Sequence, residues 1–347
     1  MGAASITDVA VKANVSKATV SRVLSGRRNK EDDIARRVRQ AAEQLNYQAN
    51  AAASALRSDT TNIIGLVIHD PLDPFCARMV AELEPMVSDD GKQLLIGVGA
   101  DAATQAERID AMLARRVDGL AVIPPSDAGE PLPLDDYVGD VPLVQISGHS
   151  LSLHTNWVGV DESAAMKLVL SHLAAHNSTS VAFLSRAVDS SDAAQLLGTF
   201  QNSVSMMTMM TEPGWTTFGD GTAERGYRDA MELFGRRGPR PNGLICASDD
   251  VAIGAMMALA RLGLDVPGDV KIIGSGDTPA AGTSWPTLTS IRPPCHLIAH
   301  ETLRLIDVSG SKHWLPAHVA FPPQLVQRES TSSPRLGSSD MTAFNEG

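Results

Sequence analysis

The chain has 347 residues, of which 43% are hydrophobic, and it carries a formal net charge of −11. At roughly 100–200 residues per domain, this length predicts two or three domains, and the hydrophobic content excludes a broadly disordered chain. No apolar run approaches the ~18 residues of a transmembrane helix, and residues 1–20 lack the apolar region of a signal peptide. We therefore expect a cytoplasmic protein with no membrane partner.

The cysteines and histidines show no metal-binding or catalytic pattern. Cys76, Cys246 and Cys295 are odd in number and widely spaced, which excludes a disulfide framework and every paired-cysteine zinc pattern. The nine histidines never occur at metal-ligand spacing, and no phosphate-binding loop or nucleophile motif is present. We therefore expect no metal, no cofactor and no enzyme activity.

The charge is distributed unevenly along the chain. Residues 1–57 hold ten Lys or Arg and five Asp or Glu, a net charge of +5, and the remaining 290 residues carry −16. A small basic segment attached to a large acidic body indicates a head that binds a polyanion. On charge alone, an ordinary fluctuation in solvated surface charge is the alternative.

The N-terminal segment, residues 1–48, is expected to contain three short helices. Apolar residues at helical spacing and capping residues predict their ranges as 6–13, 17–24 and 32–45. A three-residue turn joins the first two helices, and Asn14 suits the left-handed conformation that a tight turn needs. This pattern describes a helix-turn-helix.

The second of these helices is expected to present basic and short side chains outward. They are Lys17, Ala18, Thr19, Ser21 and Arg22. Short hydroxyl groups and bases suit contacts with DNA phosphates and base edges, and Arg22 is the best candidate for a bidentate guanine contact. Helix spacing alone leaves a generic small bundle with a polar face as an alternative.

The residue types in the head give a more specific signal of function than the helical spacing of its apolar positions does. Residues 6–10 read ITDVA, residues 13–16 read ANVS, residues 18–24 read ATVSRVL and residues 45–50 read LNYQAN. This series resembles the DNA-binding head of the LacI/GalR family of bacterial transcription regulators, almost without gaps. Asn14 stands where the family usually has Gly, and it can adopt the same backbone conformation.

The resemblance implies a hinge helix in the alanine-rich segment 49–60. In the family, two copies of this helix pack together in the minor groove of an operator, and a leucine at the position of Leu56 wedges between base pairs. So short a helix is marginal alone in water, and an ordinary interdomain linker is the alternative. The expected DNA contacts are Thr7, Ser16, Lys17, Ala18, Thr19, Ser21, Arg22, Asn50, Ala53 and Leu56.

Beyond residue 60, apolar runs alternate with amphipathic stretches, which predicts βα units and parallel sheets. Strands are expected over 63–68, 93–98, 119–123, 143–146, 157–160, 181–184, 243–246 and 270–273. Helices are expected over 75–88, 104–115, 163–176, 223–234 and 249–262. Eight strands fit two doubly wound subdomains better than one.

The LacI/GalR resemblance continues through this body. Examples are DPF at 73–75, RVDGL at 116–120 and DDVAIGA at 249–255. The family has two periplasmic-binding-protein-like subdomains with a cleft between them. The expected fold is therefore an all-α helix-turn-helix head joined to an α/β body of two doubly wound parallel-sheet subdomains.

The same resemblance implies the domain boundaries. The DNA-binding domain is expected over 1–48, the hinge over 49–60, and an effector-binding and dimerisation domain over 61–330. Within the body, the N-subdomain should comprise about 61–160 and 291–322, and the C-subdomain about 161–290 and 323–330. Residues 331–347, rich in Ser, Thr and Gly, are expected to be a disordered tail without apolar heptads, so a homodimer is expected.

Ligands of doubly wound folds bind beyond the carboxyl ends of the strands. There, Asp side chains can accept paired hydroxyl groups while an aromatic ring covers the C–H face of a ligand. The expected effector contacts are Asp73, Phe75, Ser147, Asp161, Gln195, Ser248, Asp249 and Asp277. Each Asp alone is also a candidate helix N-cap, as Asp249 is at the start of its helix.

Several positions in this cleft depart from the family pattern. Gln195 stands where an Arg usually holds the effector, and Ser248 stands where many members have Asn. Gly276 replaces an Asp, and Gly221 replaces a stacking aromatic residue. Without the Arg, phosphorylated ligands would meet mainly Asp side chains and be repelled. The expected effector is a neutral or cationic polar molecule such as a sugar, polyol or nucleoside, and loss of effector binding is the alternative.

Together these features predict a homodimeric, sequence-specific DNA-binding transcriptional regulator. We expect a repressor whose affinity for a palindromic operator in double-stranded DNA responds to a small polar effector, and which associates with the nucleoid when bound. A solute-binding protein of the periplasmic type is disfavoured by the basic head and the missing signal peptide. An enzyme that uses this fold is disfavoured because the catalytic motifs are absent.

Overall fold

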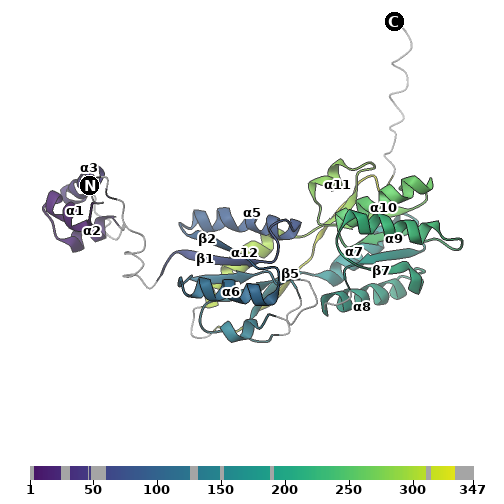
Figure 1. Cartoon of the computed structure of the whole chain (residues 1–347), viewed down its shortest axis with the longest axis horizontal. Coiled ribbons are helices and arrows are strands. Elements are labelled where there is room, and N and C mark those ends of the chain that lie inside the picture. Colours follow the sequence, from purple (N-terminus) through teal and green to yellow (C-terminus); the bar gives the residue numbers. More distant parts are fainter. Residues whose placement is uncertain are drawn as a thin grey trace, which may run out of the picture. The chain divides into compact units, whose positions relative to one another are not determined.

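The structure is a computed structural model that describes residues 4–24, 32–45, 47, 60–125, 132–148, 152–187, 191–309 and 314–332 (Figure 1). The chain divides into two compact units, Met1–Thr61 and Asn62–Gly347. The predicted hinge contacts Asn50, Ala53 and Leu56 lie outside the described residues, as does the chain beyond Ser332. In the described part of the chain, no helix combines the length and apolar content that a membrane crossing requires.

The first unit contains three helices within its described residues: α1 (Ile6–Ala13), α2 (Lys17–Leu24) and α3 (Asp33–Gln44). The predicted capping box at the start of α1 is confirmed. The hydroxyl of Ser5 accepts from the amide of Asp8, and the carboxylate of Asp8 accepts from the amide of Ser5. Two backbone amides at the start of this short helix are thereby satisfied by side chains.

One small apolar core holds these helices together. Val9 of α1, Val20 of α2 and Val38 of α3 are fully buried within it. Asn14 adopts the left-handed conformation, with φ of 54°, and so reverses the chain between α1 and α2 as predicted. Because α2 buries Val20 and Val23 on one side, its opposite side faces solvent.

The second unit contains two six-stranded sheets. The first has the order β11-β5-β4-β3-β1-β2 with every pair parallel. Its strands are β1 (Ile63–Ile68), β2 (Gln93–Val98), β3 (Gly119–Val122), β4 (Leu143–Ile146), β5 (Asn156–Val160) and β11 (His318–Phe321). The second has the order β12-β10-β9-β8-β6-β7, parallel except for the antiparallel pair of β10 and β12. Its strands are β6 (Val181–Ser185), β7 (Thr216–Phe218), β8 (Gly243–Cys246), β9 (Lys271–Ser275), β10 (Thr289–Arg292) and β12 (Gln324–Val326).

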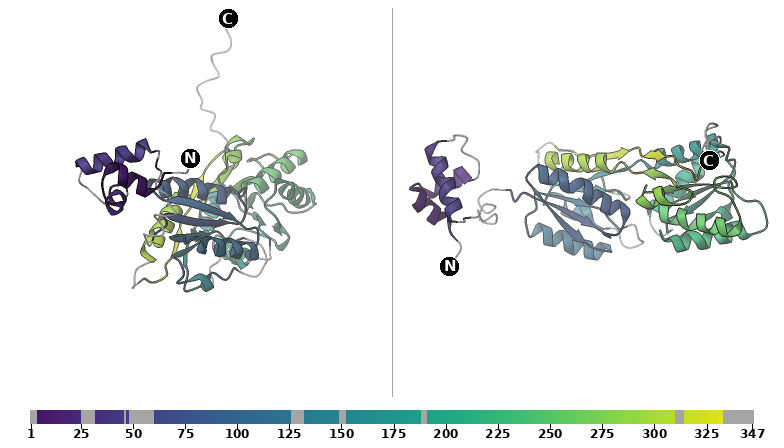
Figure 2. Two further views of the ribbon diagram at one scale, coloured as in Figure 1. Left: turned by 60° about the vertical axis from the view of Figure 1, so that its left-hand side comes forward. Right: turned by 90° about the horizontal axis from the view of Figure 1, so that it is seen from above.

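Helices cover both faces of each sheet (Figure 2). Around the first sheet lie α5 (Pro74–Asp89), α6 (Ala102–Leu113), α12 (Cys295–Ser309) and a 3₁₀ turn, η1 (Leu134–Tyr137). Around the second lie α7 (Glu162–Ala175), α8 (Ser191–Met206), α9 (Ala223–Gly235), α10 (Asp249–Leu262), α11 (Pro279–Thr283) and η2 (Pro213–Trp215). Alternation along β1 illustrates the packing, since Leu66 faces α5 and α12 while Val67 faces α6. The predicted fold class is confirmed.

The chain passes from one sheet to the other after β5, after β10 and after β11. The eight predicted strands are present. Sequence patterns missed β7, β10, β11 and β12, which have only three or four residues each. Such short segments become strands because they pair with a strand already in place, not because of their own periodicity.

The expected start of a disordered tail at residue 331 is wrong. Ser330 and Thr331 are buried in the second unit. The hydroxyl of Ser330 donates to the carbonyl of Ile272 at 2.6 Å, and Thr331 Oγ1 lies 2.8 Å from Nε2 of His172. These small polar side chains complete hydrogen bonds of the body, a role that composition cannot distinguish from that of a solvated tail.

The packing of α9 against α10 depends on two glycines. A β-carbon on Gly226 of α9 would lie 2.1 Å from the carbonyl oxygen of Val251. One on Gly254 of α10 would lie 1.9 Å from the carbonyl oxygen of Ala223. Because backbone atoms cannot swing away as the end of a side chain can, the two helices approach this closely only through glycine.

We expect Gly226→Ala to lower the free energy of unfolding by roughly 1–3 kcal/mol, because the two helices must separate to admit the methyl group. The matched control is Gly235→Ala at the end of the same helix, where nothing lies within 4 Å of the added carbon. That change should be neutral or stabilise by up to about 1 kcal/mol. Urea unfolding of the full-length protein measures both, and equal effects would contradict the close approach.

Candidate functional site

The predicted DNA-contacting residues of the described head lie on α1, on α2 and in the turn between them. On α2, Lys17, Ala18 and Arg22 are exposed, while Thr19 and Ser21 are half-buried. The hydroxyl of Ser16 accepts from the amide of Thr19 at 3.1 Å, so this side chain caps the start of α2. The helix therefore presents its basic side chains from a firmly held N-terminal turn.

The exposed charges of α2 differ from those of α3. On α3, Arg36 and Arg37 both pair with Asp33, at 2.9 and 3.5 Å. Lys17 and Arg22 form no ion pair with any residue that the structure describes. The face of α2 opposite Val20 and Val23 thus offers unneutralised positive charge, which is the electrostatic requirement for contact with phosphates.

In the body, the predicted effector contacts lie at the carboxyl ends of strands or on the helices that follow them. Asp73 and Phe75 follow β1, Ser147 follows β4, Asp161 follows β5, Gln195 lies on α8 after β6, Ser248 and Asp249 follow β8, and Asp277 follows β9. Phe75 is half-buried against the core of the first sheet, and Gln195 is exposed. The residues thus belong to the two edges where such folds bind ligands.

Asp73 and Asp161 act as helix N-caps. Oδ1 of Asp73 accepts from the amide of Cys76 at 2.8 Å, and Oδ1 of Asp161 accepts from the amide of Ala164 at 2.9 Å. Each cap uses one carboxylate oxygen and leaves the other directed elsewhere. The capping role and a ligand-binding role are therefore compatible at both positions.

Asp249 is not the N-cap of its helix, although the sequence suggested that role. The N-cap of α10 is Ser248, whose hydroxyl accepts from the amide of Val251 and donates to the carbonyl of Gly221. Asp249 is 1% exposed, and it accepts from Ser290 Oγ at 2.5 Å and from the amide of Thr278 at 2.7 Å. Burial raises the pKa of this carboxyl above its ordinary value. The expectation that Asp249 caps its helix is therefore wrong, whereas its contact with an effector stays a prediction.

Asp277 is also engaged internally. Its backbone is left-handed, with φ of 47°, and its two carboxylate oxygens accept from Arg292 Nε and Arg328 Nη2, each at 2.6 Å. Burial acts to raise the pKa of Asp277, but the hydrogen bonds from the two arginines outweigh it and hold that pKa below its ordinary value. Both carboxylate oxygens thus already accept from arginine donors, and the expected contact of Asp277 with an effector stays a prediction.

A third arginine links the two subdomains, because it reaches from α5, beside the first sheet, to the loop that follows β9 of the second sheet. Nη2 of Arg78, on α5, donates to the backbone carbonyl of Asp277 at 2.8 Å. Arg78, Arg292 and Asp277 also line a pocket of about 430 Å³ beside the crossover segments. Sequence reasoning missed all three arginines, because their common partner is far from each of them along the chain.

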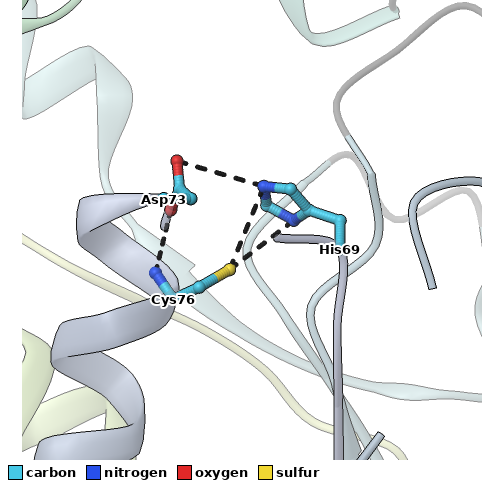
Figure 3. Close-up of side chains that lie close together, drawn as sticks. All are labelled: His69, Asp73 and Cys76. Carbon is cyan, nitrogen blue, oxygen red and sulfur yellow. Dashed lines mark hydrogen bonds and ion pairs between the residues drawn. The ribbon is translucent and has the colours of Figure 1, made fainter. Parts of the chain in front are cut away.

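The structure brings together three side chains that the sequence did not connect: His69, Asp73 and Cys76 (Figure 3). Cys76 Sγ lies 3.6 Å from His69 Nδ1 and 3.9 Å from His69 Nε2. Oδ2 of Asp73 lies 3.9 Å from His69 Nε2. Burial and the charge of Asp73 raise the pKa of the Cys76 thiol to about 12. The signal available in the sequence was the spacing of these residues: Asp73 follows His69 by four positions, and Cys76 follows Asp73 by three.

Comparison with known proteins relates both units to one group of regulators. Residues 5–50 match the family described as bacterial regulatory proteins, lacI family, and residues 170–331 match a periplasmic binding protein-like domain. The HTH-type transcriptional regulator GalR of Escherichia coli is 31% identical over 343 residues, covering 97% of this chain and 98% of that protein.

Two solved structures show the same fold. The lac repressor dimer bound to operator and the anti-inducer ONPF has a TM-score of 0.85 at 23% identity, covering 95% of this chain and 99% of that one. A transcriptional regulator CelR–cellobiose complex has a TM-score of 0.68 at 24% identity, covering 94% and 99%. Helices and sheets of the two units thus recur in the same order in those proteins.

We expect Asp277→Asn to lower the free energy of unfolding by roughly 1–3 kcal/mol at pH 7, because it leaves two arginines without their anion. The range allows for solvent screening of the half-exposed Arg292. Since the folded-state pKa lies below the ordinary 3.8, this stabilisation is present above pH 3.8 and is lost as the pH falls through the folded value. Urea unfolding at pH 7 and near pH 3 checks both statements.

The control for this change is Asp250→Asn, which alters an exposed carboxylate two positions after the strand-end Ser248. It should cost no more than about 0.5 kcal/mol. An Asp277→Asn variant that behaves like this control at pH 7 would show that the arginine pairs contribute nothing.

Proposed function

The chain belongs to the lacI family of bacterial regulatory proteins, which are DNA-binding transcriptional regulators, and we propose that it is a homodimeric repressor controlled by a small polar effector. In this proposal two heads bind the halves of a palindromic operator, and the effector binds at the strand-end edges of the body. The observation that carries the DNA assignment is the exposed face of α2, where Lys17 and Arg22 have no acidic partner among the residues that the structure describes.

The dimer follows from the size of the head. A single helix of eight residues reads only a few base pairs, so two heads are needed for a specific site. Half-sites one helical turn apart, roughly 34–36 Å, match two recognition helices related by a twofold axis. The similarity to a lac repressor dimer bound to operator supports this arrangement.

The effector is proposed to be a neutral polar molecule: a sugar, polyol or nucleoside. The similarity to a CelR–cellobiose complex supports a carbohydrate. Asp73 and Asp161 each keep a carboxylate oxygen that does not serve the helix cap, and Ser147, Phe75 and Gln195 lie at the same edges. Gln195 supplies no positive charge to hold a phosphate.

A repressor without an effector is the second candidate, and a specific observation favours it. Both oxygens of Asp249 and of Asp277, two of the four carboxylates among the expected effector contacts, already accept hydrogen bonds from protein donors. Gly221 and Gly276 add no side chain there. Fewer free acceptors therefore remain at these strand ends to orient a polyhydroxylated ligand.

We expect Arg22→Ala to lose roughly 1–3 kcal/mol of discrimination against operators with a changed base pair, because a bidentate guanine contact disappears. The control is Arg36→Ala, which removes an exposed arginine on α3 that already pairs with Asp33. Affinities for the operator and its single-base variants, at one fixed salt concentration, measure the effect. If the Arg22→Ala variant keeps the same sequence preference, the assignment of α2 to the major groove is wrong.

For the effector, we expect calorimetry on the full-length protein to show binding of a neutral sugar, polyol or nucleoside and weaker binding of the corresponding sugar phosphate. The physical reason is repulsion between phosphate and the free oxygens of Asp73 and Asp161. Tight binding of a sugar phosphate with no response to neutral ligands would contradict this assignment. No binding in any class, with operator affinity retained, would favour the effector-free repressor.

A further inference from the structure

The loop between β1 and α5 gathers three side chains with metal-ligand atoms. His69 directly follows β1, Asp73 is the N-cap of α5, and Cys76 lies in the first turn of that helix. Their ligand atoms all lie within 4.8 Å of one another (Figure 3). Reversal of the chain from strand to helix produces this convergence, because the cap geometry points the Asp73 carboxylate back over its own first turn.

Each of the three directs a ligand atom toward the others, although Cys76 also belongs to the fully buried core of the first sheet. Oδ1 of Asp73 accepts from the amide of Cys76, so Oδ2 is the oxygen that turns toward His69. The sulfur of Cys76 faces the imidazole ring, and both ring nitrogens are within 4 Å of it. The side chains of His69 and Asp73 are 21% and 35% exposed, so an ion can reach the cluster from solvent.

The distances suit a small tetrahedral ion. Zinc bonds of about 2.0–2.1 Å to nitrogen or oxygen and about 2.3 Å to sulfur place neighbouring ligand atoms roughly 3.3–3.6 Å apart. With Nε2 of His69 as the ligand atom, its separations from Cys76 Sγ and Asp73 Oδ2 are both 3.9 Å, and all three ligand atoms lie within 4.8 Å of one another. These separations exceed the zinc-bound values by a few tenths of an ångström, so the three side chains must close slightly around an ion.

The mixture of ligand types restricts the ion. Magnesium and calcium prefer sites built from oxygen atoms, whereas a set of sulfur, imidazole nitrogen and one carboxylate oxygen suits zinc and similar transition metals. Three protein ligands leave a fourth tetrahedral position open to water or to another molecule.

We propose that His69, Asp73 and Cys76 form a binding site for a zinc-type divalent cation, open at one position, at the strand-end edge of the first sheet. This site goes beyond the proposed sugar, polyol or nucleoside effector and does not rest on it, but it uses Oδ2 of Asp73, so the cation and a direct contact of that oxygen with the effector are alternatives. The simpler alternative is a helix cap beside a thiol–imidazole hydrogen bond that binds no ion.

The test uses the full-length protein after treatment with a chelator, with Co²⁺ as a spectroscopic probe and Zn²⁺ as its competitor. We expect one Co²⁺ to bind per chain and to give a thiolate-to-cobalt charge-transfer absorption that Zn²⁺ abolishes. Cys76→Ser should eliminate this absorption. His69→Gln and Asp73→Asn should weaken Co²⁺ binding by more than the roughly tenfold that loss of an outer-shell partner costs.

These variants are chosen to preserve the fold, since Ser is close to Cys in size and Asn is a good helix N-cap. Circular dichroism of each variant checks that the helices remain. The matched controls are Cys295→Ser, a buried cysteine outside the cluster, and His300→Gln, an exposed histidine on α12. Both should bind Co²⁺ like the unaltered protein.

Two results would overturn the proposal. One is the absence of any charge-transfer absorption when Co²⁺ is added to the folded protein. The other is an absorption that survives in Cys76→Ser or disappears equally in Cys295→Ser, since either would place the metal elsewhere. Operator binding measured in chelator tests the regulatory function separately, so failure of the metal site leaves that function unaffected.

Discussion

Helices bury the parallel strands of the body on both faces of each sheet, and this burial determines where polar side chains can meet a ligand. Every residue of β3 and β4 is buried, because helices cover the two sides of the sheet. Polar side chains that can meet a ligand are therefore expected mainly in the loops at the strand ends, whereas those within the strands, such as Gln145 of β4, are buried. Since the strands run in one direction, these loops gather at one edge of each sheet. All the proposed effector contacts, and the His69–Asp73–Cys76 cluster, lie at such edges.

Helix capping and ligand binding compete for the same carboxylates at these edges. Each helix begins where a ligand would bind, so an Asp there satisfies backbone amides first. Asp73 and Asp161 can serve both purposes because a cap needs one oxygen. At Asp249 and Asp277, hydroxyl, amide or guanidinium donors already bond to both carboxylate oxygens, which leaves these groups less acceptor capacity. The chemistry available to an effector is what these structural roles leave free.

Helix α5 connects several of these features. Its first turn carries the Asp73 cap and Cys76, and one turn later Arg78 reaches the carbonyl of Asp277 beyond the second sheet. Asp277 is itself held by two arginines, so the contact joins α5 to a rigid point of the other subdomain. A ligand or ion bound at the start of α5 would therefore contact the helix that packs on the first sheet and also reaches the second subdomain.

The sequence by itself determined the features that depend on neighbouring residues. The capping box of Ser5 and Asp8, the turn at Asn14, the helix ranges of the head and the eight strands with continuous apolar runs all follow from patterns within a few positions. Only the tertiary structure decided the partner of Asp249, the three arginines around Asp277 and the pairing of β7, β10, β11 and β12. Ser290 is 41 residues from Asp249, and Arg328 is 51 from Asp277. Such pairs form because folded layers bring distant segments to one edge, and no local pattern encodes which segments those are.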